Sequence, residues 1–217
     1  AVVCDGMGGT HGGRVASAIA VACFQREIQN DLRADMTADQ LRHVMLAAIA
    51  AANDAIRREA GRNADYRHMG TTLVCALARP DMALIANIGD SRAYHITPEG
   101  IRQISRDHSV VESMVAKGDI TPQEARRHPN RNLITRALGP DIDAKADTFT
   151  LPWRSGEYIL LCTDGLVNTV SDQEMLFEVL YDGDVNGCLE HLLQISLQRG
   201  APDNITAVLL LNDEERS

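Results

Sequence analysis

The stretch Val2-Val3-Cys4-Asp5-Gly6-Met7-Gly8-Gly9 opens the chain with a short apolar run that stops at an Asp-Gly pair. The run predicts a buried strand, and the glycines that follow as far as residue 13 predict a loop whose backbone lies close to a ligand. A second apolar run, residues 157–162, also ends close to an Asp-Gly pair, Asp164-Gly165. We therefore expect two buried strands that each carry an aspartate at the end.

A third aspartate, Asp203, precedes the last apolar run, residues 205–211. If this run pairs antiparallel with residues 157–162, Asp164 and Asp203 meet at one sheet edge, and Asp5 joins them if its strand shares that direction. Three neighbouring carboxylates call for a compensating charge, which a hard divalent cation with oxygen ligands supplies. The pattern predicts a Mg²⁺ or Mn²⁺ site, whereas the alternative reading makes each aspartate an ordinary turn residue.

Helical and strand patterns occur in blocks along the chain. Two long helical patterns, the second starting at a capping box of Thr37 and Gln40, precede several short apolar runs that we interpret as an antiparallel meander. A capping box of Ser171 and Glu174 begins another helix near the end. Helices are expected at residues 14–32, 37–59, 171–181 and 185–197, and meander strands at 71–77, 82–88, 92–96 and 101–104. This order predicts an α+β fold in which helices cover the faces of the sheets.

Charge and composition exclude several classes of function. The 217 residues include 30 Asp and Glu against 21 Lys and Arg, a net charge of −9, which disfavours nucleic-acid and anionic-membrane binding. The longest apolar run, residues 44–52, is far shorter than the about 20 residues of a membrane span, so no membrane insertion by this segment is expected. The five cysteines form no CxxC pair and are expected to be free thiols in a reducing cytoplasm.

Other phosphate chemistries find no support in the sequence. No cysteine is followed six positions later by arginine, which excludes a cysteine phosphatase, and P-loop and HExxH motifs are absent. The segment Gly89-Asp90-Ser91-Arg92 reads as a tight turn in which Asp90 and Ser91 bond backbone groups.

Together these segments resemble the protein phosphatase 2C family of metal-dependent serine/threonine phosphatases, and its bacterial branch in particular. The similarity runs in order through eight motifs: Val3-Cys4-Asp5-Gly6-Met7-Gly8-Gly9, Met69-Gly70-Thr71-Thr72, Asn87-Ile88-Gly89-Asp90-Ser91-Arg92, Ser105-Arg106-Asp107-His108, Gly118-Asp119-Ile120-Thr121, Thr135-Arg136-Ala137-Leu138-Gly139, Cys162-Thr163-Asp164-Gly165-Leu166 and Pro202-Asp203-Asn204-Ile205-Thr206.

The resemblance implies a four-layer α-β-β-α sandwich, two antiparallel sheets flanked by helices. Residues 1–217 would form a single phosphatase domain, and residues 108–131 would form a flap beside the site. Relative to the family pattern, the N-terminal strand is expected to be missing from these residues. Either the sequence is a fragment of a longer chain, or the upstream residues are absent from the protein and the family's phosphate-binding arginine is lost with that strand.

The resemblance also implies roles for individual residues. Asp5 would bridge two Mn²⁺ or Mg²⁺ ions, the Gly6 carbonyl would bind the second ion, and Asp164 and Asp203 would complete the first. Asp107 would help Asp164 to hold a weaker third ion. For the proton that the leaving alkoxide needs, His11 is the candidate general acid.

The expected activity is hydrolysis of phosphoserine and phosphothreonine in phosphoproteins by a metal-activated water, reversing a bacterial serine/threonine kinase. The alternative is a non-catalytic phosphatase-fold module that regulates or binds. The expected partners are phosphoprotein substrates, such as the kinase and its targets, and not nucleic acid. The expected state is a cytoplasmic monomer.

Overall fold

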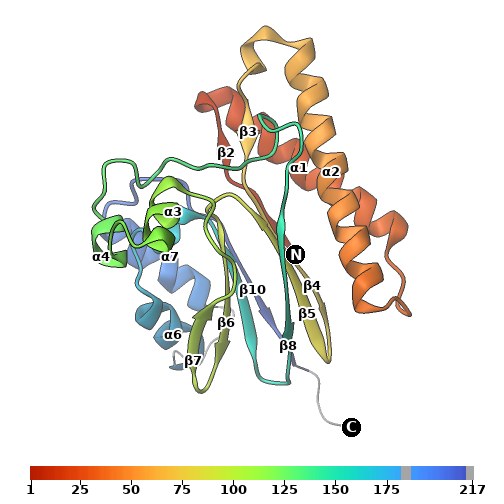
Figure 1. The fold of residues 1–217 in the computed structure, drawn as a ribbon. Helices are drawn as coiled ribbons and strands as arrows, with labels where there is room; N and C mark the ends of the chain where they lie inside the picture. Colours follow the sequence, from red (N-terminus) through yellow and green to blue (C-terminus); the bar gives the residue numbers. More distant parts are fainter. Residues whose placement is uncertain (182–186, 214–217) are drawn as a thin grey trace.

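Two antiparallel sheets form the centre of the computed structural model, which describes residues 1–181 and 187–213 (Figure 1). The first sheet has the order β1 (Val2–Val3), β4 (Leu73–Arg79), β5 (Met82–Ile88), β8 (Asp147–Pro152). The second has the order β10 (Ala207–Leu211), β9 (Tyr158–Cys162), β6 (Arg92–Thr97), β7 (Gly100–Gln103). A separate pair, β2 (Gly6–Met7) and β3 (Gly70–Thr71), extends beyond the first sheet.

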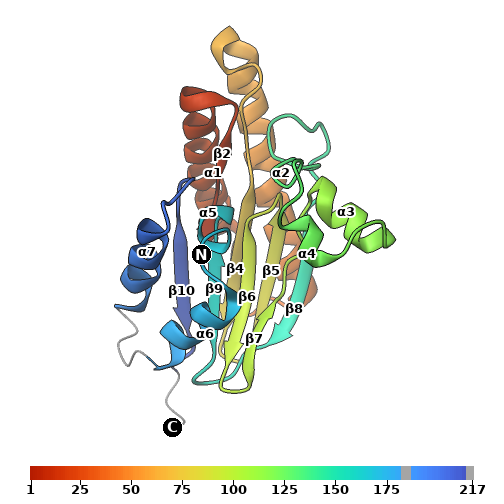
Figure 2. The ribbon, with the colours of Figure 1, turned by 90° about the vertical axis from the view of Figure 1, so that its left-hand side faces the viewer.

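Helices cover the outer face of each sheet. Figures 1 and 2 show α1 (Gly9–Asp31) and α2 (Ala38–Arg62) on one side, and α6 (Asp172–Tyr181) and α7 (Cys188–Gln198) on the other. The shorter helices are η1 (Ala64–Tyr66), α3 (Val110–Lys117), α4 (Pro122–Ala125) and α5 (Asp164–Val167). The expected α+β sandwich of four layers is confirmed.

Strand alternation explains why four layers form. In β4 the side chain of Leu73 belongs to the core beneath α1 and α2, whereas that of Val74 belongs to the core between the sheets. In β9 Leu160 packs toward α6 and α7, and Leu161 faces the other sheet. Both faces of these strands are apolar and buried, so each sheet needs a partner on each side.

The expected four-stranded meander is wrong. It separates into two hairpins, β4–β5 in the first sheet and β6–β7 in the second, and β5 pairs with β8 while β6 pairs with β9. The segment Gly89-Asp90-Ser91 therefore carries the chain from one sheet to the other. Strand β8, which the sequence reading missed, fills the edge beside β5.

The expected glycine loop before the first helix is also wrong, because α1 already begins at Gly9. Glycine is unfavourable within helices, but here tertiary packing decides. A side chain at Gly6 would overlap the backbone of Gly13, and a side chain at Gly13 would lie 2.6 Å from the Gly6 carbonyl carbon. The two glycines let the first turns of α1 pack directly against the chain that follows Asp5.

The remaining helix predictions are close to the structure. Helix α2 begins at the predicted capping box of Thr37 and Gln40, and Ser171 and Glu174 form the reciprocal bonds predicted at the start of α6. The predicted start of the last helix at residue 185 lies outside the described residues. In the part of the chain that the structure describes, no helix has the length and apolar character needed to cross a bilayer.

Candidate metal centre

The pairing of β9 with β10 brings Asp164 and Asp203 to the same end of the second sheet. Cys162 lies opposite Ala207, and beyond this pair the Thr163 hydroxyl donates to the Asn204 carbonyl at 3.1 Å. Gly165 tightens the junction, because a side chain there would overlap the Asn204 carbonyl oxygen. The predicted meeting of the two aspartates follows from this register.

Asp5 reaches the same place from the first sheet. Its backbone N–H donates to the Thr72 hydroxyl at 3.0 Å, and its carbonyl accepts from the Thr72 N–H and the Thr71 hydroxyl, both at 2.8 Å. Its carboxyl group lies close to those of Asp164 and Asp203. Burial, followed by the charges of Asp164 and Asp203, raises the pKa of Asp5 to about 7.

The Asp164 carboxyl is in the same electrostatic situation. Burial, and next the neighbouring Asp203, raises its pKa, although the Asn168 side-chain amide donates to its Oδ2 at 3.1 Å. The raised pKa values show that nearby positive charge, including that of Arg92 acting on Asp164, does not compensate the ionised forms of Asp5 and Asp164. A cation placed between them would remove the cost of ionisation.

Asp107 lies in a different environment from the one expected. Arg92 donates to both oxygens of its carboxylate, with Nη2 at 2.7 Å from Oδ2 and Nε at 3.0 Å from Oδ1, and Gln103 donates to Oδ1 at 3.1 Å. The side chains of this pair are only 13% and 28% exposed for Asp107 and Arg92 respectively. The charge of Asp107 is therefore compensated by an arginine.

Asp90 is the site residue that the sequence reading missed. Its pKa is raised to about 7, first by burial and then by the charges of Asp164 and Asp107. Its carboxyl group lines the same cavity as Asp164, and the hydroxyl of the next residue, Ser91, bonds to the Thr72 hydroxyl and not to backbone. The signal available in the sequence was an aspartate between two apolar strands, the same context as Asp5 and Asp164.

A buried histidine fixes the turn that carries Asp90. The Gly89 N–H donates to Nδ1 of His108 at 3.2 Å, and the His108 N–H donates to the Gly89 carbonyl at 2.8 Å. With Nδ1 accepting, the ring proton lies on Nε2, which is 3.2 Å from Asp147 Oδ2. This tautomer connects the Asp90 turn to the start of β8.

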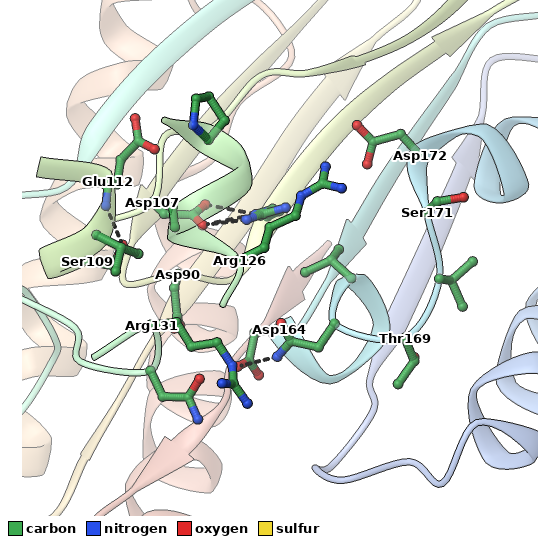
Figure 3. Close-up of a pocket in the computed structure, with 18 of the residues that line it drawn as sticks. Asp90, Asp107, Ser109, Glu112, Arg126, Arg131, Asp164, Thr169, Ser171 and Asp172 are labelled. Carbon is green, nitrogen blue, oxygen red and sulfur yellow. Dashed lines mark hydrogen bonds and ion pairs between the residues drawn. The ribbon is translucent and has the colours of Figure 1, made fainter. Parts of the chain in front are cut away.

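An open cavity of about 940 Å³ lies between these carboxylates and the flap, residues 108–131 (Figure 3). Asp90, Asp107, Asp164 and Asp203 line it, together with residues of the flap and of α5 and α6. Asp5 and Gly6 are not among the residues that line the cavity, and Gly6 pairs with Thr71 in the small β2–β3 ribbon.

His11 lies in the first turn of α1 and is exposed. It is not among the residues that line the cavity.

Oxygen ligands dominate the site, as a hard divalent cation requires. Among residues 1–181 and 187–213, however, no three acidic, histidine or cysteine side chains are grouped closely enough to enclose a single ion. Mg²⁺ usually keeps several water ligands and is bound through one or two carboxylates.

The chain is similar to known proteins over nearly its whole length. The family model described as protein phosphatase 2C matches residues 1–209. The serine/threonine phosphatase stp of Listeria monocytogenes is 34% identical over 212 residues, which are 98% of this chain and 84% of that protein.

Two solved structures show the same fold. The crystal structure of a bacterial serine phosphatase matches with a TM-score of 0.90 at 35% identity, covering all of this chain and 87% of the other. The catalytic domain of the phosphatase PstP in complex with two manganese ions matches with a TM-score of 0.83 at 33% identity, covering 96% of this chain and 85% of the other. With the family model matching nearly the whole length, this chain belongs to the protein phosphatase 2C family.

Proposed function

We propose that this chain hydrolyses phosphoserine and phosphothreonine in phosphoproteins at a centre of two Mn²⁺ or Mg²⁺ ions. The observation that carries the proposal is the convergence of Asp5, Asp164 and Asp203 from two sheets, with the pKa of both Asp5 and Asp164 raised by burial and by neighbouring carboxylates. A relative of known structure holds two manganese ions, and other relatives are named serine/threonine phosphatases.

The proposed ligands are Asp5, the Gly6 carbonyl, Asp164 and Asp203. Asp5 is suited to binding both ions because its carboxyl is close enough to those of Asp164 and Asp203 for their charges to raise its pKa, after burial, while its backbone N–H is held by Thr72. Bound ions would supply a deprotonated water near neutral pH and neutralise the phosphoryl oxygens. Asn168 keeps one Asp164 oxygen oriented by its hydrogen bond, so less reorganisation is needed when the site is loaded.

For a weaker third ion we propose Asp90 with Asp164. The expectation from the family pattern was Asp107, but both of its oxygens accept hydrogen bonds from Arg92. The pKa of Asp90, in contrast, is raised first by burial and then by the charge of Asp164, which acts more strongly than any other charged neighbour. Asp107 acts by keeping Arg92 in place at the cavity wall.

His11 remains the candidate that returns a proton to the leaving alkoxide. It is exposed and follows Asp5 closely in sequence, on the first turn of α1. A His11→Gln variant that lowers turnover of an alkyl phosphate far more than that of a phenyl phosphate would support this role, because phenolate needs little protonation to leave. Equal losses on both substrates would exclude it.

The direct test is hydrolysis of p-nitrophenyl phosphate and of a phosphothreonine peptide with added Mn²⁺. Asp164→Asn should lower kcat by about 100-fold or more and abolish the rise in Tm that Mn²⁺ gives the unaltered chain. Asp35→Asn, the same change at an exposed loop position, should leave both readouts unchanged. Turnover by the Asp164 variant at the unaltered rate would overturn the proposal.

The thermal readout separates this enzyme from the alternative of a non-catalytic phosphatase-fold module. A chain that gains stability with Mn²⁺ but hydrolyses neither substrate would be such a module.

We further propose that the physiological substrates include a bacterial serine/threonine kinase and its targets, and that the chain acts in the cytoplasm as a monomer. The five cysteines, all within the described residues, form no disulfide with one another, and four of them are buried, which suits a reducing compartment. Light scattering after size-exclusion chromatography tests the monomer, and dephosphorylation of the autophosphorylated kinase from the same genome tests the partner.

A further inference from the structure

The end of the flap and the residues just after it carry a concentration of positive charge that the acidic chain as a whole does not lead one to expect. Between Glu124 and Asp141 there is no acidic residue, whereas this interval holds Arg126, Arg127, Arg131 and Arg136. In a chain of net charge −9, this local excess lies next to the candidate metal centre.

Three of these arginines line the cavity that contains the carboxylates. Arg126, Arg127 and Arg131 are exposed, and no ion pair with a described residue is found for any of them. Figure 3 shows the side chains of Arg126 and Arg131 extending from the flap into the space between it and helices α5 and α6. They approach that space from the side opposite Asp172.

The other arginines nearby are already paired. Arg92 is bound to Asp107 and Arg199 to Glu174, with closest distances of 2.7 and 2.6 Å, and Arg136 lies 3.1 Å from Asp147. The three flap arginines therefore differ from their neighbours in the cavity by having no anion of this chain to bind. Guanidinium groups bind carboxylates and phosphates through paired N–H donors, so their missing partner is an anion.

The phosphoryl group that reacts has its own positive partners in the proposed metal ions. The flap arginines line the same cavity and are placed to meet a second negative group on the same substrate. We propose that Arg126, Arg127 and Arg131 select phosphoserine and phosphothreonine segments whose flanking residues are anionic, through either carboxylates or a second phosphate. This inference rests on the proposed phosphatase function.

The test compares three phosphothreonine peptides that differ only in residues flanking the phosphothreonine: alanines, glutamates, or alanines with a second phosphorylated residue. With Mn²⁺ at low ionic strength, we expect kcat/KM for the two anionic peptides to exceed that for the alanine peptide by about tenfold, mainly through KM. Raising the salt concentration to about 0.5 M should reduce this ratio to about twofold, because the arginines are exposed.

The variant Arg126→Gln/Arg127→Gln/Arg131→Gln should bring the ratio close to one. The matched control Arg58→Gln/Arg102→Gln/Arg154→Gln also removes three positive charges, but at exposed positions outside the cavity. It should keep the tenfold ratio. A preference for the doubly phosphorylated peptide alone would identify phosphate as the second anion, and equal preference would show that charge suffices. Either result supports the selection.

Two outcomes would overturn the inference. One is hydrolysis of all three peptides at equal kcat/KM by the unaltered chain. The other is a flap variant that loses activity equally on all three, which would place the arginines on the reacting phosphoryl group or in the fold. If no peptide is hydrolysed at all, the proposed function fails instead, so the two failures are distinguishable.

Discussion

The hydroxyl oxygens of Thr72 and Ser91 lie 2.6 Å apart in the interior, where the ends of the two sheets meet. Thr72 also accepts the backbone N–H of Asp5, and Ser91 directly follows Asp90. One buried pair of hydroxyls therefore connects an aspartate that enters from the first sheet with an aspartate at the crossing into the second.

Thr72→Val should lower the free energy of unfolding by about 1–3 kcal/mol, because it leaves both the Asp5 N–H and the Ser91 hydroxyl without their buried partner. Thr72→Ser keeps the hydroxyl and should recover most of the Mn²⁺ affinity that the valine variant loses. Urea unfolding and calorimetric titration with Mn²⁺ provide the two readouts. Equal Mn²⁺ affinity in the valine and serine variants would contradict a positioning role for the hydroxyl.

Asp90→Asn and Asp107→Asn should have opposite consequences. Removing the Asp107 charge leaves Arg92 unpaired in a largely buried position, so stability should fall by about 1–3 kcal/mol. Removing the Asp90 charge relieves repulsion with Asp164, so the metal-free chain should be no less stable at pH 8. Denaturant titrations without metal test both variants, and a larger loss of stability for Asp90→Asn would refute the environments described for the two carboxyls.

Metal-free protein should become less stable as the pH rises from about 4 to about 7. Asp5 and Asp90 have folded-state pKa values of about 7, raised above those of unfolded aspartate, so the folded chain binds more protons than the unfolded chain in this window. The slope of the unfolding free energy with pH is then negative, and the destabilisation is complete above pH 7. Unfolding curves with EDTA and with saturating Mn²⁺ should differ most at pH 8, and the metal should remove this contribution to the slope.

Gly6→Ala should destabilise the fold by about 2 kcal/mol or more, since its methyl group would overlap the backbone of Gly13. Gly61→Ala is the matched control: it lies in the last turn of α2, and a side chain there meets nothing within 4 Å. That substitution should stabilise by about 0.5–1 kcal/mol. The two Tm shifts, measured with EDTA present, should have opposite signs.

Strand polarity made half of the site predictable. Asp164 follows one apolar run and Asp203 precedes another, and both runs read as buried strands. When these strands pair antiparallel, the end of the first and the start of the second lie at the same sheet edge, which brings the two aspartates together. Placing Asp5 beside them required its strand to run in a favourable direction in the other sheet, which the sequence left open. The structure supplies that direction through the pairing of β1 with β4.

The environments of Asp90 and Asp107 could not be predicted from the sequence. Asp90 was read as a turn residue because β5 and β6 were expected to be neighbours, whereas the chain crosses between sheets there. Asp107, which follows β7, is bound by Arg92 at the start of β6. This contact depends on side-chain geometry that strand patterns do not give. Strand β8 was overlooked because only alternate residues, Phe149 and Leu151, contribute to the core between the sheets.

The proposed metal ligands come from two layers that are held together mainly by side chains, so the proposed site depends on the alignment of those layers. Asp5 belongs to one layer, Asp164 and Asp203 belong to the other, and the residues between them, such as Val74 and Leu161, make nondirectional apolar contacts. A small slip of one sheet over the other would preserve every strand hydrogen bond yet separate the carboxylates. Heat inactivation should therefore begin at a temperature where the β-sheet circular dichroism is still intact.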